Sequence, residues 1–441
     1  MKNTLIQTIL CFLIFVPAFA QTPDKTKLDQ YFTALESNNK FTGSVSVSQN
    51  GKTLYTRSVG LYDQEKGLKT NENTKFRIGS ISKTFTATLI LKAVEENKLK
   101  LTDKLDKYFP GVPNASSISI ENMLNHHSGI HNFTNDAEYT SYMTQPKTEA
   151  EMISIIAKAP SDFQPGSKGD YSNSNYVLLS YILEKVYKKP FKAIVNEKII
   201  TPLSLKNTYY GVKTNTVNNE AYSYSFDGKW TKEAETDMSI PMGAGAMVST
   251  PTDLSKFIEG LFAGKIISPA SLEQMKTMKD NFGLGLFTFP LHSKKAYGHN
   301  GGIDGFTSLL VYIPEDKTSV AIVSNGATDY STGDVSKIVL DWVYKQPFEV
   351  PSFKSANYTS EQLDKYTGNY TTTEIPISIA ITKDGTSLMA QAKGQSTFPL
   401  AAAEENVFKF SQAGIVLEFK PEQNQMILKQ GGGVFTFTKA K

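Results

Sequence analysis

The position of the strand-like runs constrains this sequence most, because they stand at both ends of a largely helical segment. Residues 43–48 alternate with period two and meet Asn50-Gly51, a dipeptide that accepts the positive φ angles of a tight hairpin turn. We therefore expect residues 53–59 to return as a second strand. Two further apolar runs, 306–313 and 319–324, follow the helical middle of the chain. Early and late strands are then expected to share one sheet.

Helices are expected between these strands. The segment from Ser80 to Glu96 is apolar on nearly every face, which predicts a helix buried inside a domain. Thr250-Pro251-Thr252-Asp253 predicts a helix start, with a threonine cap, a proline where its missing N–H costs nothing, and an acid in the first turn. The predicted fold is an α/β (α+β) sandwich, in which helices flank an antiparallel sheet and a mostly helical subdomain is added.

The chain divides into two parts on length and pattern. Its 441 residues exceed what one hydrophobic core usually organises. We expect a larger domain over 21–346, a proline-marked linker over 347–355 and a β-rich accessory domain over 356–441. The last part consists of short alternating runs separated by turn sequences, which predicts a small antiparallel barrel or sandwich of about eight strands.

The N-terminus has the three parts of an export signal. Lys2 gives a basic start, residues 10–16 are apolar, and Ala18-Phe19-Ala20 carries small residues where signal peptidase cuts. Residues 1–20 are thus predicted to be a signal peptide and the mature chain to be periplasmic or secreted. The apolar run is too short for a bilayer core of about 30 Å, so no stable membrane anchor is expected after cleavage. The only cysteine, Cys11, lies in this segment, which leaves a mature chain without thiols.

The net charge and the setting of the histidines argue against nucleic acid and metal ions as ligands. The formal net charge is +3, too small a basic excess to predict binding to nucleic acid. His126, His127 and His131 lie close together, but no ordered set of acids or cysteines accompanies them. We therefore expect structural histidines, no metal site and no cofactor.

One short motif carries chemistry. Ser80 and Lys83 are three residues apart on the predicted helix, so Lys83 lies about one turn from Ser80 and can take its proton if burial lowers the lysine pKa. A neighbouring base activates serine, which is otherwise a weak nucleophile. A helix start also directs a free N–H and the positive dipole end toward a developing oxyanion. The alternative is a capping serine beside a solvated lysine, but so apolar a helix favours the catalytic interpretation.

Three motifs together resemble a known family. Ile78-Gly-Ser-Ile-Ser-Lys-Thr-Phe-Thr86 resembles the active-site helix of class C β-lactamases and their D,D-peptidase relatives. Tyr171-Ser-Asn173 is similar to the family's Tyr-x-Asn motif, and His299-Asn-Gly301 to its Lys-Thr-Gly or His-x-Gly motif. Their order and spacing are also those of the family. The resemblance spans about residues 25–345 and implies the serine β-lactamase and penicillin-binding protein superfamily, with a β-lactamase/transpeptidase-like fold.

The resemblance implies roles for individual residues. Ser80, Lys83 and Tyr171 would be catalytic, with Tyr171 expected as a phenolate, favoured by a nearby ammonium, that relays a proton to the leaving group. Asn173 would bind the substrate's acylamide carbonyl or hold Lys83. His299, where β-lactamases usually carry lysine, would give a hydrogen bond and only a pH-dependent charge.

Two glycines complete the expected site. Gly301 belongs to the strand motif beside the substrate, and the N–H of Gly302 would complete the oxyanion hole. The implied function is a serine acyl hydrolase that forms an acyl-enzyme and acts on D-amino-acid peptides, amides or esters, as D,D-carboxypeptidases, D-aminopeptidases and related esterases do. The partner would be a small-molecule or peptide substrate, with cell-wall fragments among the candidates. A class C β-lactamase and a non-catalytic penicillin-binding or sensor protein stay open as alternatives.

Overall fold

The computed structural model describes residues 24–291, 294–328, 330–353, 358–410, 413–430 and 433–440. The predicted signal peptide over 1–20, with Cys11, lies outside these ranges. Within them, no helix is both long enough and apolar enough to cross a membrane.

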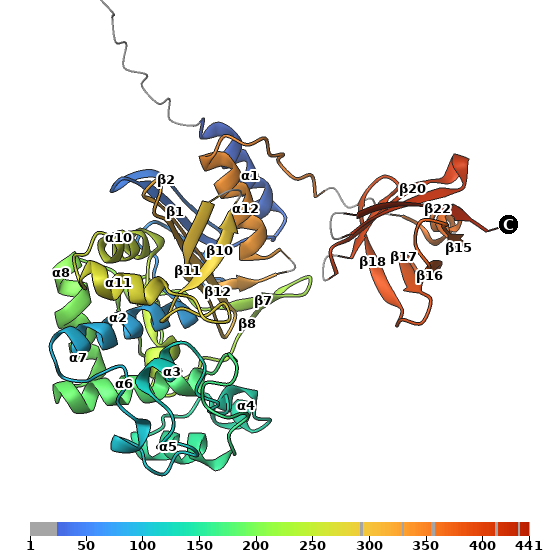
Figure 1. The fold of residues 1–441 in the computed structure, drawn as a ribbon. Coiled ribbons are helices and arrows are strands. Elements are labelled where there is room, and N and C mark those ends of the chain that lie inside the picture. The colour runs from blue at the N-terminus through green and yellow to red at the C-terminus, as the bar shows by residue number, and fades with distance from the viewer. Residues whose placement is uncertain are drawn as a thin grey trace, which may run out of the picture.

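A six-stranded antiparallel sheet forms the framework of the larger unit, in the order β10-β11-β12-β13-β1-β2 (Figure 1). Its strands are β1 (Gly43–Gln49), β2 (Lys52–Val59), β10 (Phe287–Leu291), β11 (Lys294–Ile303), β12 (Phe306–Ile313) and β13 (Thr318–Ser324). β1 pairs with β13, which confirms that early and late strands share a sheet. Asn50 and Gly51 have φ angles of 52° and 75°, as the expected hairpin turn requires.

Helices cover both faces of this sheet. α1 (Thr26–Ser37) and α12 (Thr332–Val343) pack on the face that carries Val311 and Val320. α10 (Pro251–Phe262) packs on the other face, where Leu310 and Ala321 belong to the main core. The side chain of Thr250 accepts a hydrogen bond from the N–H of Asp253, which confirms the predicted cap of α10.

The remaining helices form the lobe in which Ser80 is placed. They are α2 (Ser82–Glu95), α3 (Ile120–Leu124), α4 (Tyr139–Tyr142), α5 (Glu149–Lys158), α6 (Asn173–Tyr187), α7 (Phe191–Val195), α8 (Thr201–Leu203), α9 (Met242–Gly245) and α11 (Pro269–Lys276). α2 is buried on nearly all sides, and its Phe85 stacks on Phe257 of α10 at 3.7 Å between ring centroids. Ser80 itself lies in a 3-10 turn, Gly79–Ile81, that precedes α2, rather than in its first α-helical turn.

Short strands connect the sheet to this lobe. They are β3 (Leu61–Asp63), β4 (Leu68–Lys69), β5 (Phe76–Arg77), β6 (Tyr209–Tyr210), β7 (Tyr224–Phe226), β8 (Trp230–Lys232), β9 (Met247–Ser249) and β14 (Gly326–Ala327). β5 leads directly into the Ser80 turn and is held by pairing with β9.

The C-terminal part is a closed antiparallel barrel of eight strands, as expected. The strands are β15 (Gly368–Thr371), β16 (Ser378–Asp384), β17 (Ser387–Ala392), β18 (Phe398–Glu404), β19 (Val407–Phe410), β20 (Ile415–Lys420), β21 (Gln425–Gln430) and β22 (Gly433–Lys439). α13 (Ser360–Leu363) precedes them. The barrel has a core of its own, with Leu388, Phe408 and Phe437 at its centre.

Part of the expected linker packs on the larger unit. Phe348, Val350 and Phe353 lie against the core shared by α1, α12 and the sheet, and the Phe353 ring meets the edge of Tyr330 at 6.0 Å between centroids. The larger unit therefore extends at least to Phe353 in its packing, which the proline pattern of this segment did not indicate.

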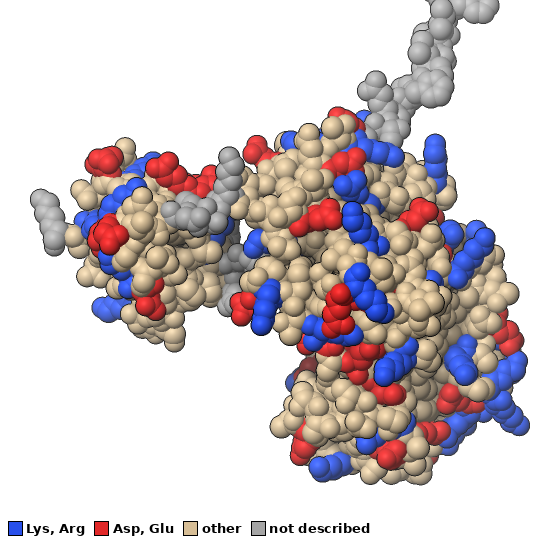
Figure 2. All heavy atoms as spheres, turned by 180° about the vertical axis from the view of Figure 1, so that it is seen from behind, with Lys and Arg blue, Asp and Glu red and all other residues tan. Residues whose placement is uncertain are grey.

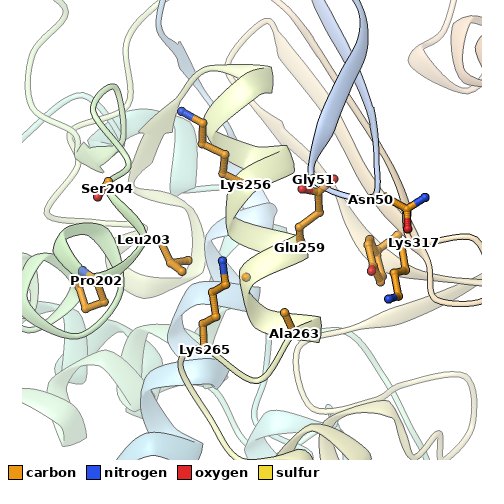
Figure 3. A pocket seen from close by; sticks show the side chains of 12 residues that line it. Asn50, Gly51, Pro202, Leu203, Ser204, Lys256, Glu259, Ala263, Lys265 and Lys317 are labelled. Atoms are coloured by element: carbon orange, nitrogen blue, oxygen red, sulfur yellow. The ribbon is translucent and has the colours of Figure 1, made fainter.

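The face shown in Figure 2 has no extended patch of a single charge, because lysines and arginines are interspersed with acidic residues there. A hollow of about 540 Å³ opens where the β1–β2 turn meets α8 and α10 (Figure 3). Lys256, Lys265 and Lys317 stand around Glu259 there. None of the residues expected to carry chemistry lines this hollow.

Candidate active site

Ser80 Oγ is the centre of a hydrogen-bonded cluster. Lys83 Nζ lies 2.9 Å from it, and the Tyr171 hydroxyl donates to it at 2.8 Å. Lys83 Nζ also donates to Asn173 Oδ1 and to the Ala244 carbonyl, both at 2.8 Å. The structure thus brings the three residues expected to be catalytic together with Asn173, from three separate elements.

Two glycines let strand β11 lie directly against the Ser80 turn. Gly79 has a φ of 49°, and a Cβ there would come 2.7 Å from the Gly302 carbonyl oxygen. A Cβ at Gly301 would come 2.2 Å from the Ile78 carbonyl oxygen and 3.0 Å from the Ser80 nitrogen. Such distances exclude any side chain at either position, so Gly301 acts by permitting this close approach.

Burial determines the protonation of the cluster. Lys83 is fully buried, and this burial lowers the pKa of its amine well below the usual value. Burial also raises the pKa of Tyr171 above its usual range, against a smaller opposing effect of the hydrogen bond to Ser80. Burial therefore favours the neutral forms of both the amine and the phenol. This differs from the phenolate expected at Tyr171, because burial disfavours the charged form of the phenol.

His299 is also neutral, contrary to the expected pH-dependent charge. Its ring is buried and packs on Phe287 at 4.4 Å between centroids. Burial, with the nearby Lys83, lowers the pKa of His299 to about 3, and the Nδ1–H donates to the Asn300 carbonyl against this effect. The sequence showed that histidine replaces lysine here, but could not show that the ring is shielded from water.

His126 has a closer relation to the site than its sequence context indicated. Its ring lies 4.5 Å from that of Tyr171 between centroids. Its Nδ1 accepts the Ser172 N–H at 3.2 Å, and burial lowers the pKa of the ring well below its usual value. His126 is therefore a neutral side chain that positions Tyr171, while His131 bonds instead to Asp136 and Asp162. The described residues contain no cluster suited to a metal ion.

A pocket of about 380 Å³ opens at Ser80. Asn173, Ala244 and Gly302 line it beside Ser80. The segment between 132 and 148 contributes Phe133, Thr134, Tyr139 and Met143. The other lining residues are Glu233, Ala234, Thr236, Pro241, Gly245, Ile303 and Asp304.

Comparison with known proteins supports the family that the motifs indicated. The sequence model of the family described as Beta-lactamase matches residues 28–338, more than half of the chain. The chain belongs to the beta-lactamase family. Its relatives in this family are hydrolases, so the chain is a serine hydrolase.

Three relatives of this beta-lactamase family member are similar to it in sequence or in fold. It is 28% identical over 314 residues to a teichoic acid D-alanine hydrolase of Staphylococcus aureus (strain MRSA252), covering 69% of this chain and 75% of that protein. The D-amino acid amidase from Ochrobactrum anthropi SV3 is 26% identical, with a TM-score of 0.63. The match covers 72% of this chain and 98% of the amidase chain. The octameric penicillin-binding protein homologue from Pyrococcus abyssi shares the fold over 94% of this chain and 100% of its own, at 24% identity and a TM-score of 0.68.

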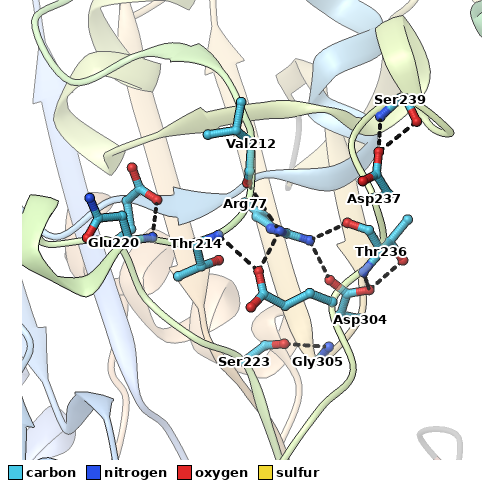
Figure 4. Close-up of polar contacts among 12 residues, drawn as sticks. Arg77, Val212, Thr214, Glu220, Ser223, Thr236, Asp237, Ser239, Asp304 and Gly305 are labelled. Atoms are coloured by element: carbon cyan, nitrogen blue, oxygen red, sulfur yellow. Dashed lines mark hydrogen bonds and ion pairs between the residues drawn. The ribbon is translucent and has the colours of Figure 1, made fainter. Parts of the chain in front are cut away.

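In this hydrolase a network of ion pairs joins the strand before Ser80 to the turn after Gly302 (Figure 4). Arg77, three residues before Ser80, donates to Asp304 at 3.0 Å and to Glu235 at 2.8 Å. Asp304, two residues after Gly302, also accepts the Thr236 N–H and hydroxyl. Burial raises the pKa of Asp304, while Thr236 and Arg77 oppose the shift. Sequence analysis missed this network, because nothing local in the sequence indicates that residues 77, 235 and 304 meet.

We expect Asp304→Ala to lower the free energy of unfolding by about 3 kcal/mol, since breaking a buried ion pair leaves a charge with less compensation. Urea denaturation measures this loss. Lys189→Ala, which removes an exposed pair with Glu197, is the control and should cost less than about 1 kcal/mol. Equal losses in the two variants would contradict the role given to Asp304.

The low pKa of His299 generates a second expectation. Above about pH 3 the ring is neutral, so no charge at this position titrates between about pH 5.5 and 9. With two N-acetyl-D-alanyl esters, one with a neutral and one with a carboxylated leaving group, the ratio of kcat/KM values should stay constant across this range. His299→Lys should shift the ratio toward the carboxylated ester, because lysine keeps its charge there. A step in the wild-type ratio near pH 6.5 would show a protonated His299.

Proposed function

We propose that this hydrolase cleaves the amides and esters of D-amino acids through an acyl-enzyme on Ser80. The observation that carries the proposal is the contact of Ser80 Oγ with both the buried Lys83 amine and the Tyr171 phenol. The base and the proton relay then each lie within hydrogen-bond distance of the nucleophile, as general acid–base catalysis requires.

The surroundings of Lys83 suit a neutral base. A neutral amine has two N–H groups and one lone pair. Asn173 Oδ1 and the Ala244 carbonyl are the two acceptors for the N–H groups, which leaves the lone pair facing Ser80 Oγ. In acylation, Ser80 Oγ attacks the substrate carbonyl carbon and its proton passes to Lys83. The carbonyl oxygen becomes an oxyanion, which the N–H groups of Ser80 and Gly302 would stabilise.

The second half of the reaction reverses the proton path. Lys83 returns the proton through the Tyr171 hydroxyl to the leaving amine or alcohol as the bond to the carbonyl carbon breaks. A water molecule then attacks the acyl-Ser80 ester, loses one proton to the same base and releases the free acid. Ser80 recovers its proton and the cluster is restored.

The choice of substrate follows from charge and from the relatives. The relatives are a D-amino acid amidase and a teichoic acid D-alanine hydrolase by name, both of which release a D-amino acid. A neutral His299 offers no fixed positive charge to the carboxylate of a D,D-carboxypeptidase substrate or a β-lactam. We therefore favour amides and esters over these, and turnover over a non-catalytic sensor role.

Two further parts of the proposal concern the ends of the chain. Residues 1–20 would direct export and be removed, so that the enzyme acts outside the cytoplasm on small or cell-wall-derived substrates. The barrel would be an accessory domain, because it has its own core and contributes no residue to the pocket at Ser80 among those described.

The test is a panel of D- and L-phenylalanine amide, D-alanine methyl ester and a chromogenic cephalosporin, with Ser80→Ala as the control. We expect steady-state turnover of the D-amide and the D-ester, slower turnover of the L-amide, little of the cephalosporin and none by Ser80→Ala. A single stoichiometric acylation without turnover would support a sensor instead. Preferred hydrolysis of the cephalosporin would support a β-lactamase.

A further inference from the structure

The pocket at Ser80 is acidic. Its lining includes two carboxylates, Asp304 and Glu233, and contains no lysine, arginine or histidine. Burial lowers the pKa of the Lys83 amine beside Ser80, which favours its neutral form. A substrate that carries a positive charge therefore fits this pocket better than one that carries a carboxylate.

Asp304 is not available to a substrate. Its two oxygens accept hydrogen bonds from Arg77 and Thr236, and its side chain is only 1% exposed (Figure 4). The charge of Asp304 is thus balanced inside the protein.

Glu233 differs from Asp304 in this respect. It is half-buried, directly follows β8 and forms no ion pair with any residue that the structure describes. The nearest basic residue in sequence, Lys232, lies over the Tyr222 ring at 3.1 Å from its centroid and 3.9 Å from Glu65. Glu233 therefore brings to the pocket a carboxylate without a cation.

Glu233 packs next to the β11–β12 hairpin, which carries Gly302 of the expected oxyanion hole. Its N–H donates to the Ser223 carbonyl at 2.9 Å, and the Ser223 hydroxyl accepts the Gly305 N–H at 3.1 Å. A Cβ at Gly305 would lie 3.0 Å from the Glu233 Cγ, so the two are in contact. Gly305 belongs to the turn that follows Gly302. The Glu233 side chain thus packs against the hairpin that carries Gly302.

We propose that Glu233 binds the free α-ammonium group of a D-aminoacyl substrate. This rests on the proposed function, since in an aminoacyl amide or ester the ammonium stands on the carbon next to the reacting carbonyl. With that carbonyl at Ser80, the ammonium stays within the same pocket as Glu233. The apolar lining, formed by Phe133, Tyr139, Met143, Pro241 and Ile303, would take the amino-acid side chain. The hydrolase would then prefer aminoacyl compounds with an unblocked amine over N-acylated ones.

The test compares D-alanine p-nitroanilide with N-acetyl-D-alanine p-nitroanilide near pH 6.5, where the α-amine is protonated. The wild type should prefer the free amine. Glu233→Gln should lower kcat/KM for the free amine about 10- to 100-fold, the usual effect of losing a hydrogen bond to a charged group, mainly through KM. It should leave the acetylated substrate unchanged. Glu233→Asp should recover part of the loss.

Two controls keep the outcomes separate. Glu65→Gln removes an exposed acid near the same strand and should change neither substrate. Hydrolysis of p-nitrophenyl acetate, which has no amine, should be unaffected by Glu233→Gln and shows that the variant is folded. Equal effects on both anilides, or none, would overturn the role of Glu233 while leaving the hydrolase intact. A wild type that cleaves the acetate but neither anilide nor any D-aminoacyl ester would overturn the proposed function, and the role of Glu233 with it.

Discussion

The site depends on the burial of one amine. Lys83 lies on a helix that is enclosed on nearly all sides, and its Nζ is within hydrogen-bond distance of three oxygen atoms. Its three oxygen partners come from the Ser80 turn, α6 and α9. The packing of these elements around α2 therefore sets both the basicity of Lys83 and its direction toward Ser80.

This burial has a cost in stability. Burial lowers the pKa of Lys83 in the folded chain, so between the lowered and the ordinary pKa the unfolded chain binds more protons there than the folded chain does. The free energy of unfolding is reduced accordingly, and the penalty disappears only as the pH rises toward the ordinary lysine pKa of about 10.4. His126 and His299 act in the same direction below about pH 6.5, since both have lowered pKa values and must stay neutral in the fold.

The sequence predicted the parts of this structure that depend on local pattern. The Asn50-Gly51 turn, the Thr250 cap and the barrel strands follow from dihedral preferences and period-two alternation. The meeting of Ser80 with Lys83 follows from helical spacing. The contacts of Tyr171 and Asn173 with Ser80 and Lys83 were expected only through the resemblance to a family, because nothing in their own segment indicates that it folds back onto α2.

Features set by long-range contacts could not be predicted. The neutral states of Tyr171 and His299 depend on how completely neighbouring elements exclude water, which no residue pattern encodes. The Arg77–Asp304 pair joins residues 227 positions apart. The packing of Phe353 against the catalytic unit was obscured by the prolines nearby, which suggested a linker.

The most direct test of the buried base is the rate at which a fluorophosphonate labels the protein, followed by intact mass in four chains: wild type, Lys83→Ala, Tyr171→Phe and the double variant. We expect a single adduct on Ser80, absent from Ser80→Ala, and a rate about 10²- to 10⁴-fold lower in each single variant. Because the two groups share one proton path, the double variant should lose far less than the product of the two effects. Labelling that persists in Ser80→Ala, or strictly multiplicative losses, would contradict the account.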